Sequence, residues 1–381
     1  MIEKAGAGKY ALPVFLVILI GCVMALMFYP MLNMAPKELP FAVLSLDEGA
    51  QTPQGDANAG EMMADRLVNA EAPGGQDPAP IAWRLFDDQE QVDAALADNE
   101  LYGVLTIPPG FTRDQALAQA GQGEAPRVDV VLDHAKSPIA AAQMRPVLGT
   151  MFEQMQVPAD IEVINTGDAS GEPKSPVAEM MGQQIGVMPL MVMSLAGSIL
   201  LTRIFPKQSG MLRGRFTALG TQLAYAAGLS LLAAVTAVVM LDTLVSAQTP
   251  FWTTTAFLWT ASFSVMALFL GSFGIAVPIG ALVVLFALIC GMMTAVLPAE
   301  MLPAFWADWI YPWSPQHFIG DGIRDILYRG ADLMPAGTGG LLMIGGVGLV
   351  LLVLSGFLPS RGARSAAGPA PAAVPESSTA L

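Results

Sequence analysis

The longest uncharged segment of this chain restricts its fold more than any other feature of the sequence. Residues 243–299 form a run of 57 residues without Asp, Glu, Lys or Arg. A single α-helix of that length would measure about 85 Å, whereas the hydrocarbon core of a bilayer is about 30 Å thick. Glycine and proline cluster between positions 271 and 280, where we expect a turn. The segment therefore predicts two membrane-spanning helices, at residues 251–270 and 275–297.

Charged residues are concentrated in one part of the chain. Residues 31–184 carry 8 basic and 24 acidic side chains, and the other 227 residues carry the remaining 18 charges. A single soluble globule would not separate its charges in this way. The distribution predicts a polar domain joined to a membrane domain. Nucleic-acid binding is disfavoured, because phosphate contact requires clustered Lys and Arg and the polar domain is strongly acidic.

Four further apolar segments bring the predicted number of transmembrane helices to six. They are residues 10–30, 185–202, 216–241 and 338–358. The first has the basic flank of a signal peptide, but its apolar part is long and no clear A-x-A cleavage site follows it. We therefore expect an uncleaved signal-anchor helix.

Lysine and arginine in the short connecting segments predict the orientation in the membrane. The segments before the first helix, between the second and third, and after the sixth carry eight basic residues. The short loops on the opposite side carry only Arg324 and Arg329. Basic loops face the cytoplasm, so we expect cytoplasmic residues 1–9 and an extracytoplasmic domain at 31–184. The membrane domain then spans 185–358, and the Ala-, Pro- and Ser-rich tail at 359–381 is expected to be disordered and cytoplasmic.

The polar domain shows alternating strand and helix signals. Strands are predicted at 41–46, 81–86, 102–107, 127–132 and 161–164. Helices are predicted at 61–69, at 87–98 with Asp87 and Glu90 as a capping box, and from Ser137-Pro138 towards Met155. This order indicates a small α/β domain. The predicted fold class is thus a polytopic α-helical membrane protein with an inserted extracytoplasmic α/β domain.

No catalytic, cofactor-binding or metal-binding pattern is present. Two isolated cysteines, Cys22 and Cys290, and two histidines do not form a recognisable metal site. The chain lacks G-x-x-x-x-G-K-[ST], G-x-S-x-G and H-E-x-x-H. The acidic pairs at 47–48 and 87–88 lie at predicted turns, where Asp favours capping. We therefore expect a protein that is not an enzyme and has no cofactor.

The predicted spans contain no ionisable side chain between their ends, which argues against a proton-driven carrier. Small residues at Gly220, Ala224 and Gly228 recur every four positions, which allows close helix approach. They would pack either within the subunit or at a dimer face. A basic loop separates the second and third helices and contains Arg203, Lys207, Arg213 and Arg215. Its simplest role is anchoring against anionic lipid.

Two regions carry a resemblance to a known family. The sequences LPFAVLSLDEGAQT, GEMMADRL and WRLFDDQEQVDAALADNELYGVLTIPPGFTRD, within residues 39–114, resemble the outer domain of the phage-infection-protein branch of ABC type-2 permeases. The sequence LPAFWADWIYPWSPQHFIGDGIRDILYRG, residues 302–330, is similar to a permease signature with a Pro-containing turn followed by an amphipathic helix containing Arg.

The resemblance implies a permease that works as a homodimer or heterodimer with a separate ABC ATPase subunit. It further implies that residues 298–337 form a re-entrant segment on the outer side, and that the basic loop docks the ATPase. Pro312 and Pro315 would break a continuous helix there, and Arg324 would screen Asp321 and Asp325. We expect loss of Arg324 to be harmful and loss of Arg329, which is placed closer to water, to be mild.

The sequence thus predicts the permease subunit of an ABC-type exporter in the plasma (inner) membrane of a bacterium, with both termini cytoplasmic. Its expected cargo is hydrophobic or amphipathic, and its partners are the ATPase and the lipid bilayer, with no nucleic acid. The alternative is a non-transporting cell-surface scaffold or receptor, used in phage adsorption or by secretion machinery.

Overall fold

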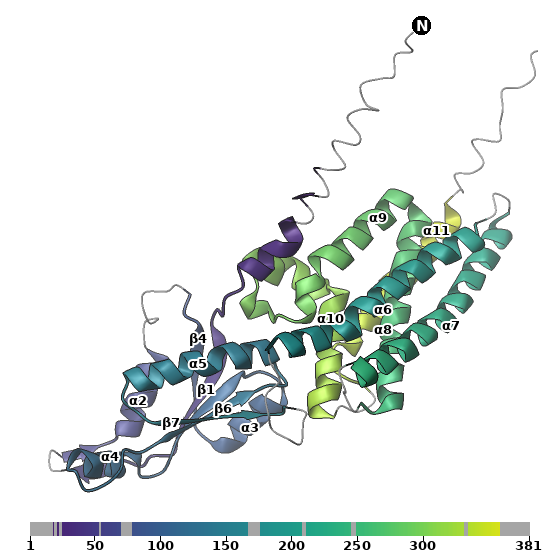
Figure 1. The fold of residues 1–381 in the computed structure, drawn as a ribbon. Coiled ribbons are helices and arrows are strands. Elements are labelled where there is room, and N and C mark those ends of the chain that lie inside the picture. Colours follow the sequence, from purple (N-terminus) through teal and green to yellow (C-terminus); the bar gives the residue numbers. More distant parts are fainter. Residues whose placement is uncertain are drawn as a thin grey trace, which may run out of the picture.

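The computed structural model describes residues 18, 21–22, 25–52, 55–69, 78–166, 176–207, 211–244, 249–330 and 334–358. Within these ranges, only the backbone is described for residues 176–182 and 290. The predicted cytoplasmic segment 1–9, most of the predicted helix at 10–30 and the tail at 359–381 lie outside the described residues. Figure 1 shows a sheet with its helices at one end of the molecule and a bundle of long helices extending from it.

The polar domain predicted at residues 31–184 is called the outer domain below, after its expected position. It contains seven strands and four helices in the described part of the chain. In order they are β1 (Leu39–Ser45), β2 (Ala50–Thr52), β3 (Gly55–Ala57), α2 (Ala59–Val68), β4 (Ile81–Phe86), α3 (Gln89–Ala97), β5 (Gly103–Ile107), α4 (Phe111–Gln119), β6 (Val128–Asp133), α5 (Pro138–Gln154) and β7 (Ala159–Ile164). The predicted α/β domain is confirmed for these residues.

Strand β1 is the centre of hydrophobic packing in this domain. The main sheet has the order β4-β1-β5-β6-β7, with β1 parallel to both neighbours, β6 antiparallel to β5, and β7 parallel to β6. Successive side chains of a strand point to opposite faces. Phe41 and Val43 accordingly pack in the cluster that contains α2 and α5, whereas Ala42 and Leu44 pack in the cluster that contains α3. Helices therefore cover both faces, which explains why β1 is apolar throughout.

The sequence located most of these elements but missed three of them, namely α4, β2 and β3. Helix α4 has only Phe111 and Thr112 buried, so it lacks the apolar periodicity of a helix. The two-stranded β2–β3 ribbon is too short to show alternation. The predicted capping box at Asp87 and Glu90 is wrong by one residue. Asp88 is the N-cap of α3 and accepts a hydrogen bond from the Gln91 amide, while the Gln91 side chain donates back to Asp88.

Asp47, which the sequence placed at a turn, is buried and joins three elements. Its Oδ2 accepts hydrogen bonds from the backbone amides of Gly60 in α2 and Thr112 in α4, each at 3.2 Å, and from the Thr112 hydroxyl. A Cβ at position 60 would lie 2.6 Å from the Cβ of Asp47. Glycine is thus required for this approach, and the carboxylate holds the end of β1 against two helix starts.

The membrane domain consists of long helices and one irregular stretch. This stretch, residues 286–329, is called the broken segment below, because short helical turns interrupt it. The α-helices of the membrane domain are α6 (Pro176–Ile204), α7 (Leu212–Leu244), α8 (Phe251–Ile275), α9 (Val277–Leu285), α10 (Pro315–Arg324) and α11 (Thr338–Phe357). Between α9 and α11 lie π-helical turns at Phe286–Cys290, Trp306–Ile310 and Asp325–Arg329, and 3₁₀ turns at Met292–Ala295, Ala299–Met301 and Tyr311–Trp313.

Four helices in the described residues, α6, α7, α8 and α11, are long and apolar enough to cross a membrane, compared with the six predicted. Most of the predicted first span, residues 10–30, lies outside the described residues. At its end, residues 25–32 are helical. The predicted span at 275–297 differs in form. Its apolar helical part covers only 277–289, about 20 Å at 1.5 Å per residue, and 3₁₀ geometry follows. The turn before it is at Ala276, so α8 continues to Ile275 rather than ending at Leu270.

Glycines allow α8 and α11 to cross closely. A Cβ at Gly348 would lie 2.3 Å from the Leu268 backbone nitrogen, and one at Gly271 would lie 2.4 Å from the Gly348 carbonyl oxygen. In a bilayer, where apolar burial gives no net drive between helices, such close approach supplies the van der Waals contact that holds them together. Small residues of α8 and α11 thus join these two helices within the subunit.

This crossing predicts that Gly348→Ala destabilises the protein by about 1–3 kcal/mol, because the added methyl group meets backbone that cannot move away. The matched control is Gly346→Ala on the same helix, where nothing lies within 4 Å of an added Cβ. The control should be neutral or slightly stabilising, since alanine favours helix over glycine. Thermal unfolding of the two purified variants measures the difference. Equal midpoints would show that α8 and α11 are not packed in this way.

Candidate functional site

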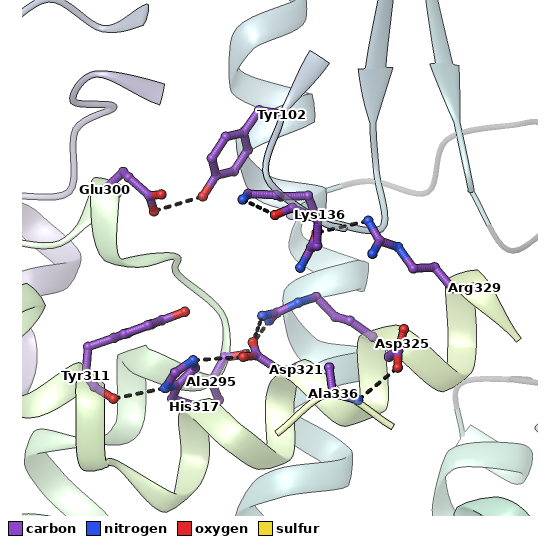
Figure 2. Close-up of polar contacts among 12 residues, drawn as sticks. Tyr102, Lys136, Ala295, Glu300, Tyr311, His317, Asp321, Asp325, Arg329 and Ala336 are labelled. Carbon is purple, nitrogen blue, oxygen red and sulfur yellow. Dashed lines mark hydrogen bonds and ion pairs between the residues drawn. The ribbon is translucent and has the colours of Figure 1, made fainter. Parts of the chain in front are cut away.

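Polar and charged side chains gather where the outer domain meets the broken segment of the membrane domain. Tyr102, Asp133 and Lys136 come from the outer domain, and Glu300, Asp321, Arg324 and Arg329 from the broken segment; these seven residues are called the interdomain cluster below. Figure 2 shows Tyr102 and Lys136 near Glu300, Asp321 and Arg329 at the boundary between the two parts. Several are buried, so their charges depend on each other more than on water.

Tyr102 and Lys136 form one side of the cluster. The Tyr102 hydroxyl donates to Glu300 Oε2 at 2.9 Å, and Lys136 Nζ lies 4.7 Å from the centre of the Tyr102 ring. Lys136 also donates to the carbonyl oxygen of Asn99. Burial, together with the nearby Glu300 carboxylate, raises the pKa of Tyr102 well above its ordinary value. The phenol therefore stays protonated and remains the hydrogen-bond donor to Glu300.

Arg329 connects the end of the broken segment to the outer domain. Its guanidinium donates to Asp133 Oδ2 at 2.8 Å and to Asn99 Oδ1 at 2.9 Å, with longer bonds to the carbonyl oxygens of Leu96 and Ala97. The Asp133 side chain is 1% exposed and that of Arg329 is 20% exposed. Arg329 is more exposed than Arg324, whose side chain is 8% exposed, as expected from the sequence. Its pairing with the buried Asp133 nevertheless argues against a mild effect of its loss.

Arg324 lies in a second group, on the membrane side. It donates to Asp321 and to the carbonyl oxygen of Ala295, the latter at 2.9 Å. Asp321 also contacts His317 Nε2 at 2.8 Å, while His317 Nδ1 lies 3.0 Å from the Tyr311 carbonyl oxygen. The predicted screening of Asp321 by Arg324 is present. Asp325 instead accepts a hydrogen bond from the Ala336 amide, because its carboxylate points towards the start of α11.

Hydrogen bonds of side-chain amides and hydroxyls join the first part of the broken segment to its later part and to α6. Gln316 donates to the carbonyl oxygen of Ala287, and Gln184 donates to that of Met292 at 3.1 Å. The hydroxyls of Thr294 and Ser314 lie 2.7 Å apart. Residues 311–316 thus run beside residues 287–294. Pro312 lies in the 3₁₀ turn before α10 and Pro315 is its first residue, so both sit where the helix is interrupted.

Two of the four basic residues in the basic loop bind backbone carbonyls at helix ends, and the other two are exposed. Lys207 Nζ donates to the carbonyl oxygens of Gly274 and Ser355, at 2.6 and 2.9 Å, and Arg215 donates to that of Leu358 at 3.3 Å. These carbonyls lie at the C-terminal ends of α8 and α11, which cations stabilise. Arg203 and Arg213 are exposed. The four residues therefore lie at one end of the bundle, but only two point their charges outward.

The small-residue stripe on α7 is not covered by any described part of the chain. Gly220, Ala224 and Gly228 are exposed, and an added Cβ at either glycine would meet nothing within 4 Å among the described residues. The stripe therefore does not pack against another described helix of this subunit. Sequence reasoning pointed to these glycines and missed those of α8 and α11, because regular spacing shows that a face is small but not which partner it meets.

The interdomain cluster connects the outer domain to the broken segment through hydrogen bonds and ion pairs. Among the described residues, no group of three or more His, Cys, Asp or Glu could hold a metal ion. Most hydrogen bonds of the cluster either join the outer domain to the broken segment or lie within the broken segment. A shift of the segment 300–329 would thus be transmitted to β5, β6 and the connecting loops of the outer domain.

Comparison with known proteins gave one match. A family model described as "ABC-2 family transporter protein" matches residues 11–357, which includes both the outer domain and the membrane domain. No curated protein and no solved structure matches the chain.

The cluster predicts that Arg329→Met destabilises the protein by about 3 kcal/mol, because it leaves the buried Asp133 carboxylate without its cation. This is the low end of the usual range, since the Ala135 amide and the Asn165 side chain still donate to Asp133. Adding Asp133→Asn should recover part of the loss. Chemical unfolding of the full chain measures both the single and the double variant.

The matched control is Arg113→Met. Arg113 pairs only with its neighbour Asp114, at 72% exposure, and such pairs contribute at most about 1 kcal/mol. If Arg329→Met and Arg113→Met unfold at the same denaturant concentration, the interdomain ion pair does not contribute to stability.

Proposed function

The chain belongs to the ABC-2 family of transporter proteins, and we propose that it is the permease subunit of an exporter that moves a hydrophobic or amphipathic cargo. A separate ABC ATPase supplies the energy in this proposal, because the sequence contains no P-loop of its own. The observation that carries the proposal is the family match over nearly the whole chain. The uncharged interior of the spans supports an apolar cargo.

Within this proposal the chain follows the phage-infection-protein branch and crosses the membrane six times. Residues 10–30 supply the first span, and 275–297 supply the fifth with its broken outer half. Residues 298–337 re-enter the membrane from the outer side. Support comes from the contacts of residues 311–316 with residues 287–294, which return the chain to the depth of α9. The outer domain then lies outside the bacterial plasma membrane, and both termini lie in the cytoplasm.

The ATPase docks on the end of the bundle that carries the basic loop. Lys207 and Arg215 are engaged with helix-end carbonyls, so their role here is to fix the ends of α8 and α11. Arg203 and Arg213 are exposed at the same end and are available to acidic side chains of a partner. The docking proposal therefore rests on these two arginines.

The exposed small-residue stripe on α7 supplies the dimer face in this proposal. Membrane helices associate through small residues that bring backbones together. Gly220, Ala224 and Gly228 offer such a surface that no described residue of the same chain covers. The partner is a second copy or a related permease.

The orientation predicts different accessibility at two exposed positions. In a chain with Cys22→Ser and Cys290→Ser, the substitution Glu124→Cys should react with a membrane-impermeant maleimide in intact cells. The substitution Met211→Cys should react only after the cells are permeabilised, because the basic loop is cytoplasmic. Equal labelling of both positions in intact cells would rule out this topology.

Docking predicts that the double variant Arg203→Glu/Arg213→Glu loses co-purification of the ATPase by about tenfold, since reversed charges repel an acidic partner surface. The ATPase to use is one encoded in a neighbouring reading frame. Stimulation of its ATP hydrolysis by the permease in vesicles should fall in parallel, at unchanged membrane abundance of the variant.

The control for docking is Arg145→Glu, an exposed arginine of the outer domain. It should leave co-purification unchanged. If no ATPase associates with the wild-type chain, the surface-scaffold alternative gains and the exporter proposal fails. If the ATPase associates equally with all variants, the partner binds elsewhere on the permease.

A further inference from the structure

An apolar groove opens on the side of the membrane domain. It has a volume of about 460 Å³ and lies between α8, α9, α11 and residues 313–315. Ala287 and Ile344 form its buried floor, whereas Leu282, Phe286 and Val347 at its rim are 57%, 41% and 51% exposed. The groove is therefore hollow between helices that otherwise pack closely. Its size falls in the range of sites that hold small ligands.

The walls of the groove offer no free hydrogen-bonding group. Its lining consists of aliphatic and aromatic side chains, and the indole N–H of Trp313 already donates to the carbonyl oxygen of Trp309. Buried polar groups without partners are costly, so a ligand with a headgroup inside the groove would be excluded. The chemistry of the walls selects a hydrocarbon chain.

The groove differs from a surface made for another helix. Membrane helices meet through small residues, as on the exposed face of α7. Here the rim is formed by large side chains, and the small residue Ala287 lies on the floor. Two of the walls, α8 and α11, are candidate membrane spans, so the medium at the rim is lipid hydrocarbon.

We propose that this groove binds one acyl chain of a membrane phospholipid. The chain would contact Trp313 and Pro315 of the broken segment on one side and α8 and α11 on the other, and so join two parts of the membrane domain. The proposal requires only that the protein lies in a membrane. It therefore stands or falls independently of transport and of any ATPase.

The test uses the full-length protein in phospholipid vesicles that contain a trace of phosphatidylcholine with a diazirine on its acyl chain. After illumination, labelled peptides are mapped by mass spectrometry. Labelling should concentrate on residues 282–287 and 343–347, several-fold above the lipid-facing residues Leu232 and Val239 of α7. Equal labelling of groove and α7 would mean ordinary contact with bulk lipid and would overturn the proposal.

Filling the groove should remove the label. Val347→Trp and Leu282→Trp fill it from opposite walls, and each should lower labelling of the other wall by about fivefold or more, because no space remains for a ligand. The matched control is Val350→Trp, which lies on α11 at similar exposure but does not line the groove. Identical labelling in the filled and control variants would overturn the proposal. Only a variant whose melting temperature matches that of the wild type is used for this comparison. The two substitutions lie on different helices, so either one can serve if the other destabilises the protein.

Two other occupants are distinguished by cross-linking. Val347→Cys is oxidised in vesicles in the presence of native Cys22. An intramolecular disulfide to Cys22 would show that the segment before residue 25 fills the groove, and a disulfide-linked dimer would show that a second copy does. Either result overturns the proposal, whereas a free thiol at 347 together with the labelling pattern above supports it.

Discussion

A backbone carbonyl or amide that leaves a helix inside a membrane must find another partner, and this requirement organises the middle of the molecule. The helix that begins at Val277 gives way to π and 3₁₀ turns after Leu285. Three carbonyl oxygens in this stretch, at Ala287, Met292 and Ala295, accept hydrogen bonds from the side chains of Gln316, Gln184 and Arg324. Non-helical backbone among apolar side chains persists only where protein groups satisfy it. The side chains of α6 and α10 are therefore the reason that α9 can end early.

The same residues connect this break to the outer domain. Arg324 contacts both the Ala295 carbonyl and Asp321, and five residues further on Arg329 contacts the buried Asp133. Arg324, at the end of α10, thus makes its contacts within the membrane domain, whereas Arg329, in the turn that follows, makes its contacts with the outer domain. Breaking a buried ion pair by removing one partner is far more costly than removing an exposed pair. The two parts of the molecule are consequently held by a few desolvated contacts, so movement of the broken segment has a direct route to the outer sheet.

The sequence allowed most of the local structure to be predicted, and the non-local pairings much less. Periodicity and apolar runs locate β1, β4 and the long helices, because each of these buries a recognisable pattern. Helix α4 was not predicted, because only its first turn is buried and the rest shows no apolar periodicity. The pairing of Arg329 with Asp133 was missed because the two residues are 196 positions apart and no local pattern marks them. The spacing of Gly220, Ala224 and Gly228 is visible in the sequence, but the close crossing of α8 and α11 depends on glycines from two separate helices.

The long-range pairing of Asp133 has a consequence for the order in which the chain can be completed. Strands β1, β4, β5, β6 and β7 and their helices all precede residue 165, so the sheet can form while later parts are still being synthesised. Asp133, however, receives its arginine only after residue 329 has been made. A nascent chain therefore carries this carboxylate without its cation, on a surface destined to be buried, until three long apolar helices, α6, α7 and α8, have been made. The sheet can therefore form early, but the ion pair that neutralises Asp133 is completed only after most of the membrane domain has been synthesised.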